Sequence, residues 1–255
     1  CNWELQGFGE YTYGRWYTIK GQRPSDETGI YRYKFDAPKS WAGQRVKIFF
    51  DGVMTDAEIM INGKPAGEMH QGGFYRFNYD ITELLNLGKK NQLEVKVAKE
   101  SANRSINAAE RKADWWLFGG IYRPVWLEVL PQVHMEHFVL NADHHGKLQV
   151  AVDMAGDAKG HEIIVSVRSL KDGKTVYTSN GQTIITHPIN NSDKEQMISG
   201  EWASIIPWST ENPNLYVAKL ELKNPEGKIV QTRETRTGFR TVEFFPQDGV
   251  YLNGT

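Results

Sequence analysis

The sequence predicts an all-β protein made of two β-sandwiches in series. Two observations predict this fold class: apolar residues alternate with polar ones in many short runs, and turn-forming residues separate the runs. Such alternation gives each strand one apolar face, as in antiparallel sheets that pack one side against a core. A chain of 255 residues is long enough for two domains of about 100–150 residues each.

The first group of predicted strands ends at Pro131. Its alternating runs are residues 30–35, 45–50, 57–61 and 93–97, and its last strand is residues 125–130. The pair Asn62-Gly63 predicts a tight hairpin, because both central residues of such a turn adopt positive φ. Only residues 80–88 have a helical pattern. We expect about one helical turn there, with Asp80 or Thr82 as its capping residue.

The second group of strands begins near Val133. Its clearest runs are residues 148–152, 162–168 and 216–222, with a turn at 171–174. Short strands and regular turns are typical of an immunoglobulin-like sandwich, although the chain's single cysteine excludes the internal disulfide of antibody domains. The polar stretch 187–199 has no apolar period, so we expect a long loop there.

Composition excludes several classes of function. The net charge of −1 and the pI near 6.7 argue against nucleic acid as a partner, because binding it needs clustered cationic surface. We expect no membrane insertion, because no apolar run approaches the roughly 20 residues of a membrane-spanning helix. The sequence also has neither a Gly-x-Ser-x-Gly elbow nor a glycine-rich phosphate loop.

The segment 114–125 contains the most informative chemistry. Asp114 precedes the paired indoles of Trp115 and Trp116, and the glycines at 119 and 120 follow. Indole faces cover the apolar side of a pyranose while a carboxylate accepts hydrogen bonds from its hydroxyls, so this pattern favours sugar binding. The alternative is a buried aromatic corner that closes a sandwich, since tryptophan is also a common core residue.

Metal binding and lipid attachment are weaker hypotheses. His134 with His137, or the run 143–145, contains metal-ligand types, but the spacing does not bring together the three or four donors of a zinc site. Cys1 could be the acylated first residue of a lipoprotein, but no flexible tether follows it. We expect instead that Cys1 marks a cut within a longer protein.

Several motifs in order resemble glycoside hydrolase family 2, the family of β-galactosidases, β-glucuronidases and β-mannosidases. The similar segments are Asn2–Gly9, Thr28–Arg32, Phe50–Val53, Ile61–Gly63, Phe118–Val125, Pro207–Tyr216, Gly238–Glu243 and Asp248–Gly254. The resemblance implies a galactose-binding-like jelly-roll domain at 1–131 and an immunoglobulin-like sandwich at 132–240. Residues 241–255 resemble the lead-in to a catalytic (β/α)₈ barrel, which the chain does not include.

The resemblance also implies an activity and a site. Family members are retaining glycosidases whose two catalytic glutamates lie on the barrel, so the chain alone is expected to be inactive and to lack catalytic residues. Asp114, Trp115 and Arg15 are the residues expected to contact the sugar. One of Trp115 and Trp116 is expected to be a core anchor and the other to face the sugar. A structural role for Asp114, as a cap of backbone amides, is the alternative.

The first loop departs from the β-galactosidase pattern. Where family members often have an asparagine that contacts the substrate, the nearest positions here are Tyr13, Gly14 and Arg15. Arg15 could address a charged or extended glycan, although an arginine that pairs with a surface carboxylate is the commoner case. The resemblance implies no cofactor for this chain. For the full-length enzyme it implies sodium, with Asp114 as a ligand, or magnesium.

Three functions remain open at this stage. The first is the noncatalytic front of an exo-acting β-galactosidase or, alternatively, of a β-glucuronidase. The second is a free-standing carbohydrate-binding module, and the third is a structural or adhesive tandem of sandwiches. The expected partners are a β-galactoside or related glycan, the missing barrel, and other copies in a homo-oligomer. The sequence does not assign a compartment, and analogy with exported glycan-degrading enzymes favours the periplasm.

Overall fold

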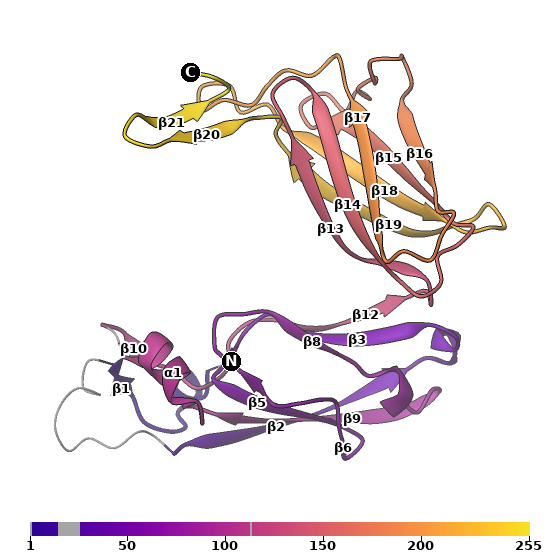
Figure 1. Ribbon diagram of the computed structural model, residues 1–255. Helices are drawn as coiled ribbons and strands as arrows, with labels where there is room; N and C mark the ends of the chain where they lie inside the picture. Colours follow the sequence, from indigo (N-terminus) through magenta and orange to yellow (C-terminus); the bar gives the residue numbers. More distant parts are fainter. Residues whose placement is uncertain (1, 15–25, 113) are drawn as a thin grey trace. The chain divides into compact units, whose positions relative to one another are not determined.

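The computed structural model describes residues 2–14, 26–112 and 114–255. Contacts between residues divide the chain into two compact units, Cys1–Val129 and Leu130–Thr255, and strands are the main regular structure of each (Figure 1). The predicted fold class, all-β with two sandwiches in series, is confirmed. None of the helices in the described part of the chain has the length and hydrophobicity needed to cross a lipid bilayer.

Two facing sheets form the first unit. In the larger sheet the strand order is β2-β9-β5-β6, with β7 also paired to β5, and in the smaller one it is β12-β3-β8. The bounds are β2 Thr28–Ala37, β3 Arg45–Phe50, β5 Asp56–Ile61, β6 Lys64–Pro65, β7 His70–Gln71, β8 Phe77–Asp80, β9 Lys89–Ala98 and β12 Val125–Leu130. A further short pair joins β4 (Val53–Met54) to β11 (Gly120–Ile121).

The core of the first unit consists of the inward residues of these strands. Val46, Ile48 and Phe50 alternate inward on β3, as the period of two predicts. They pack with Ile59 and Ile61 of β5 and with the other buried members of the cluster, Trp3, Val53, Ala57, Ile81, Val95 and Val97. The hairpin between β5 and β6 has Asn62 at φ 52° and Gly63 at φ 78°, so the turn predicted from this dipeptide is confirmed.

Short helices connect the strands of the first unit. They are the 3₁₀ turns η1 (Glu4–Gln6), η3 (Lys39–Trp41) and η4 (Thr82–Leu84), the α-helical turn α1 (Arg104–Ile106) and the π-helical turn η5 (Asn107–Arg111). The helical turn predicted within 80–88 is η4, and Asp80 Oδ1 accepts a hydrogen bond from Thr82 N at 3.0 Å. The prediction that no other segment is helical was wrong, because 104–111 is helical as well. That segment packs through the buried charged side chains of Glu110 and Arg111, so it has no apolar period to detect.

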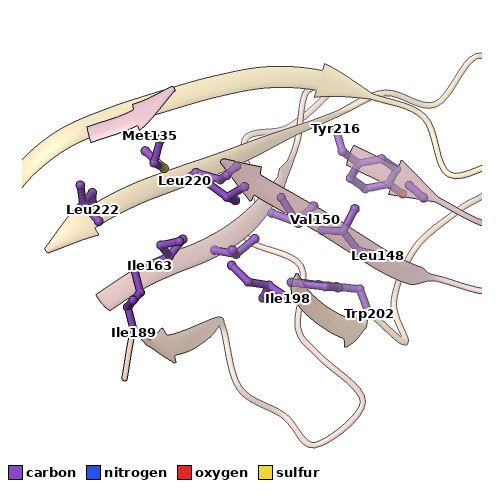
Figure 2. Packing of buried hydrophobic residues seen from close by; sticks show 14 of the residues in the cluster. Met135, Leu148, Val150, Ile163, Ile189, Ile198, Trp202, Tyr216, Leu220 and Leu222 are labelled. Carbon is purple, nitrogen blue, oxygen red and sulfur yellow. The ribbon is translucent and has the colours of Figure 1, made fainter. Parts of the chain in front are cut away.

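The second unit is also a sandwich of two sheets. One has the strand order β13-β14-β17 and the other β16-β15-β18-β19. The bounds are β13 His134–Ala142, β14 Lys147–Ala155, β15 Glu162–Ser169, β16 Ile184–Pro188, β17 Glu195–Glu201, β18 Tyr216–Lys223 and β19 Ile229–Thr237. Figure 2 shows side chains from both sheets meeting in one core, with Val150 from β14, Ile198 from β17 and Leu220 from β18.

One prediction for the second unit was wrong. The stretch 187–199, expected to be a long loop, contains the end of β16 and most of β17, so only residues 189–194 connect the two strands. Along β17 the inward positions are Gln196 and Ile198, both buried. A polar residue at one of the two core positions hid the alternation that identifies a strand.

A hairpin follows the second sandwich. Strands β20 (Val242–Phe245) and β21 (Gly249–Leu252) pair in register, with Phe244 opposite Val250. Asn253 ties the hairpin to the preceding segment: its Oδ1 accepts a hydrogen bond from Thr241 N at 3.0 Å, and its Nδ2 donates one to the Trp208 carbonyl at 3.0 Å. The hairpin is therefore an ordered extension of the second unit.

Candidate functional site

A short two-stranded ribbon displays the predicted sugar-binding segment. Strand β1 (Thr12–Tyr13) pairs with β10 (Trp116–Leu117) in antiparallel register, and Tyr13 lies opposite Trp116. Just outside this pairing, Gly14 N donates a hydrogen bond to the Trp115 carbonyl at 2.8 Å. Leu117 is buried and anchors β10 in the unit, whereas its neighbours on the N-terminal side point to solvent.

The two indoles of this segment are exposed. Trp115 is 43% exposed and Trp116 is 49% exposed, so neither is the predicted core anchor, and the alternative of a buried aromatic corner does not describe them. The ring of Trp116 contacts those of Tyr13 and Tyr11 edge-on, with centroids 5.2 and 6.1 Å apart. These contacts hold Trp116 among other rings while leaving half of its surface open to a ligand.

Asp114 lies at the start of this aromatic surface. Its Oδ1 accepts a hydrogen bond from the Tyr13 hydroxyl, which joins the two strands of the ribbon through side chains. Asp114 is thus an exposed carboxylate beside two exposed indoles, whereas the sequence motif predicted only one exposed indole. Arg15, the third predicted contact, lies outside the described residues.

Close packing beneath the ribbon fixes the glycine hinge. Gly119 N donates hydrogen bonds to both carboxylate oxygens of Glu4, at 2.9 and 3.1 Å. A Cβ on Gly119 would lie 2.0 Å from Cζ2 of the buried Trp3 ring, and one on Gly29 would lie 2.6 Å from the same ring. Only glycine fits at these positions, because Trp3 packs directly on the backbone of both.

Buried charges complete the base of the ribbon. Lys99 Nζ lies 2.8 Å from Glu4 Oε1 and 2.9 Å from Glu27 Oε2, and it donates a hydrogen bond to the Glu10 carbonyl at 2.6 Å. Arg111 Nη2 donates to the carbonyls of Lys99 and Phe118, at 2.7 and 2.9 Å. The network therefore connects the end of β9 to the segments on both sides of the ribbon.

A cavity of about 540 Å³ opens beside this network. It is lined by Trp3, Gln6, Phe8, Glu27 and Tyr31, together with residues 9 and 28–30. Burial alone would raise the pKa of Glu27, but hydrogen bonds from Lys99 and from the Glu10 backbone outweigh it and hold the pKa below 4.5. Glu27 is therefore ionised at neutral pH.

Comparison with known families identifies the chain. Residues 1–131 match the family model described as the sugar-binding domain of glycosyl hydrolases family 2, and residues 133–240 match a second model of the same family. The chain belongs to glycosyl hydrolases family 2. The resemblance of its ordered motifs to this family is thus confirmed.

Individual relatives of this family 2 chain are considerably longer. A β-galactosidase of Thermoanaerobacter pseudethanolicus is 30% identical over 228 residues, which cover 88% of this chain and 30% of that enzyme. A β-galactosidase of Priestia megaterium is 29% identical, with 95% of this chain and 24% of that enzyme covered. The crystal structure of a Bacteroides uniformis β-glucuronidase is similar with a TM-score of 0.72 and 25% identity, over 95% of this chain and 30% of that one. The chain thus spans about a third or less of the length of each of these relatives.

The metal ligands considered from sequence do not assemble. Within the described part of this family 2 chain, no three His, Cys, Asp or Glu side chains gather so that they could hold a metal ion. His134 is buried with its ring nitrogens 2.9 Å from the Pro131 carbonyl and from Glu136, which is a structural role. The sodium site expected for the full-length enzyme, with Asp114 as a ligand, stays a prediction.

Sequence reasoning missed the residues that support the site. Glu4, Lys99 and Arg111 lie far apart along the chain, and each resembles an ordinary surface charge. The available signal was positional, because Lys99 directly follows the strand β9 and Glu4 directly follows the core tryptophan of the motif. Neither position distinguishes a buried ion pair from a solvated charge before the fold is known.

Proposed function

We propose that this chain is the noncatalytic N-terminal part of a retaining exo-glycosidase that hydrolyses terminal β-galactosides. In this proposal the ribbon carrying Asp114 forms part of the wall of the substrate pocket. The supporting observation is the exposed carboxylate of Asp114 beside the exposed indoles of Trp115 and Trp116, held on a rigid base. The indoles would cover the apolar face of the galactosyl ring, and the carboxylate would accept hydrogen bonds from its hydroxyls.

The bond-breaking step would take place on another domain. A retaining glycosidase needs two carboxyl groups about 5 Å apart, one as nucleophile and one as acid/base. We assign these to the (β/α)₈ barrel that the hairpin β20–β21 would precede. The chain by itself should therefore not hydrolyse a nitrophenyl β-galactoside, and measurable turnover by the purified chain would contradict the proposal.

The assignment of Asp114 can be tested in the complete enzyme. Asp114→Ala is expected to raise KM for a β-galactoside by about tenfold, the loss of roughly 1.4 kcal/mol of substrate binding. Tyr13→Phe is the matched variant, because it keeps the ring against Trp116 and removes only the hydroxyl that bonds to Asp114. We expect a smaller rise in KM for Tyr13→Phe. If Asp114→Ala leaves both KM and kcat unchanged, the residue is structural.

The hairpin β20–β21 supports the assignment of a following domain. Phe244 and Val250 lie opposite one another, and they are 76% and 64% exposed. Phe244→Ser is expected to change the stability of the chain by less than about 0.5 kcal/mol, as for other surface sites, but to lower the melting temperature of the complete enzyme. Val139→Ser on β13 is the control for loss of an exposed apolar side chain, and it should affect neither form. Equal melting temperatures for the complete enzyme and its Phe244→Ser variant would contradict a domain on this face.

Two other functions have specific support. Similarity to the Bacteroides uniformis β-glucuronidase favours a glucuronidase as the complete enzyme, and relative rates on nitrophenyl galactoside and glucuronide would decide between them. The exposed aromatic ribbon is also compatible with a free-standing carbohydrate-binding module. Titration of the chain with galactose or lactose tests this, since millimolar or tighter binding favours the module. That copies of the protein assemble as a homo-oligomer stays a prediction.

A further inference from the structure

Lysine side chains gather at one end of the larger sheet of the first unit. They come from β2, from η3, from the hairpin strand β6 and from the start of β9, and all are exposed. We call them the lysine cluster: Lys34, Lys39, Lys64, Lys89 and Lys90. A cavity of about 400 Å³ opens there, lined by Lys34, Lys90, Asn62, Gly63, Asn91 and Gln92. None of residues 114–118 lines it, and the ribbon β1–β10 lies toward the other end of the unit (Figure 1).

Lys34 and Lys90 lie close together on the outer face of this sheet. Lys34 is opposite Gln92 in the pairing of β2 with β9, and Lys90 points to the same face two residues before Gln92. Diagonal neighbours of this kind are about 7–8 Å apart, so both ammonium groups can reach a ligand in the cavity. The side-chain amide of Gln92 makes no hydrogen bond with another described residue, which leaves it available to the same ligand.

The other three lysines border the same corner of the sheet. Lys89 is opposite the last residue of β2. Lys39 packs on the glycine before Lys89, since a Cβ on Gly88 would lie 2.7 Å from Lys39 Cγ. Lys64 follows the hairpin turn, which a hydrogen bond of 2.8 Å from Asn62 N attaches to β9. The five charges therefore belong to a single surface.

The described residues do not neutralise the lysine cluster. None of its side chains forms an ion pair with a described carboxylate, and the acidic neighbours Asp36 and Glu83 form none with it. Elsewhere on the same face of the sheet, by contrast, Lys96 of β9 is paired with Glu58 of β5 at 2.9 Å. Unpaired like charges that are held close together repel one another, so this surface is complementary to a ligand with several negative charges.

Buried amides hold the backbone beneath the cluster. Asn91 is 1% exposed, and its Oδ1 accepts hydrogen bonds from Asn62 Nδ2 at 2.7 Å and from Asn86 N at 2.8 Å. Its Nδ2 donates to the carbonyls of Asn86 and Lys89, at 3.2 and 3.0 Å. Asn62 Oδ1 accepts from Gln92 N at 2.9 Å. The two turns that carry the lysines are thus fixed to one another, so binding a ligand requires little ordering of the backbone.

The lining of the cavity indicates which class of polyanion it suits. It contains no aromatic residue and no Leu, Ile, Val or Met. Proteins that bind single-stranded nucleic acid stack bases on aromatic rings, and helices that bind membrane surfaces insert apolar side chains. An ammonium group beside a side-chain amide instead suits a molecule that carries anionic groups and hydroxyls together, because the amide both donates and accepts hydrogen bonds.

We propose that the lysine cluster binds an acidic polysaccharide. Lys34 and Lys90 would hold a carboxylate or sulfate group at the cavity, and the Gln92 amide would form hydrogen bonds with hydroxyls of the same sugar. The remaining lysines would contact anionic groups further along the polymer, and linked contacts of this kind raise the overall affinity. The proposal concerns the first sandwich alone and does not depend on the proposed glycosidase function.

The test is binding of the purified chain to polysaccharides that differ in charge. Dextran sulfate carries sulfates, polygalacturonate carries carboxylates and dextran carries neither. Each is titrated by calorimetry at an ionic strength of about 0.15 M. We expect saturable binding of dextran sulfate or polygalacturonate, no binding of dextran, and an affinity that falls as the salt concentration rises. The tighter of the two acidic ligands identifies the anionic group.

The decisive variant reverses two charges of the cluster, in Lys34→Glu with Lys90→Glu. It should weaken the affinity by at least about tenfold, because two attractive contacts become repulsive. The matched control is Lys171→Glu with Lys194→Glu, which changes the net charge equally on the second unit, where both lysines are exposed and form no ion pair with a described residue. If the cluster variant does not fold, Lys34→Gln with Lys90→Gln replaces it and should still bind more weakly than the control.

Nucleic acid is the competing ligand, because a DNA duplex also presents rows of anionic groups. It is titrated under the same conditions and should bind more weakly than the better acidic polysaccharide. The proposal is overturned if the unmodified chain binds neither acidic polysaccharide, if dextran binds as tightly, if the duplex binds more tightly, or if the cluster variant and the control lose the same affinity.

Discussion

The variant Gly119→Ala is expected to destabilise the first unit by about 3 kcal/mol, at the upper end of the usual cost of overpacking. The added Cβ would lie 2.0 Å from Cζ2 and 2.4 Å from Cε2 of Trp3. The obstacle is a rigid indole that is nine-tenths buried, so neither group can move away without loss of core packing. Displacement of Trp3 would also disturb the hydrogen bonds between Gly119 N and Glu4.

Urea unfolding of the chain measures this effect, with amide hydrogen exchange of the peptide Thr28–Ala37 to report on the first unit. Gly43→Ala is the control, because Gly43 has a φ of +74° but no atom within 4 Å of an added Cβ. Gly43→Ala should cost only the strain of placing alanine in the left-handed region of backbone conformation, about 1 kcal/mol. If the two variants lose the same stability, contact with Trp3 is not the reason for glycine at 119.

The strands were predictable where alternation was regular. The run 45–50 has small and large apolar residues at every second position, and the observed β3 has these bounds. Likewise, Val125–Leu130 was predicted as the last strand before Pro131 and is observed as β12. Alternation reports burial on one face of a sheet, which a local window of sequence contains in full.

The elements that were missed depend on burial of polar groups. The helical segment 104–111 packs through Glu110 and Arg111, and β17 places Gln196 at a core position. Each of these inward polar side chains has a hydrogen-bond partner: Arg111 donates to the Phe118 carbonyl, and Gln196 Nε2 donates to the Asp193 carbonyl. A local pattern of hydrophobicity cannot show such partners.

The candidate site was predictable only as a motif. The sequence placed an acid beside two indoles but could not show which indole was buried; the structure leaves both exposed and uses Trp3 as the anchor. The contact between Tyr13 and Asp114 joins residues from opposite ends of the first unit's sequence. It required the register of β1 with β10, which two-residue strands do not specify by pattern alone.

Loss of the buried cation Lys99 is expected to have the largest effect on stability. Its side chain is 1% exposed and that of Glu4 is fully buried, so Lys99→Met leaves an uncompensated carboxylate in the interior. Breaking a buried pair in this way typically costs about 3–5 kcal/mol. Lys96→Met is the control, because Lys96 on β9 and Glu58 on β5 form a half-exposed pair, and such pairs contribute about 0–1 kcal/mol.

The same variant should also change how stability depends on pH. The folded pKa of Glu27 lies below 4.5 because the bonds from Lys99 and the Glu10 backbone outweigh the effect of burial, which alone would raise it. Glu27 therefore adds stability above pH 4.5, and this contribution is lost as the pH falls through the lowered pKa. Without Lys99 the pKa rises toward its ordinary value, so urea unfolding of Lys99→Met should depend less steeply on pH below 4.5 than that of the unmodified chain. Replacing both charges, in Lys99→Met with Glu4→Leu, should recover part of the lost stability, because the fully buried carboxylate of Glu4 is then no longer left without its cation. A cost for Lys99→Met no larger than that for Lys96→Met would show that Glu4 finds another partner or takes up a proton.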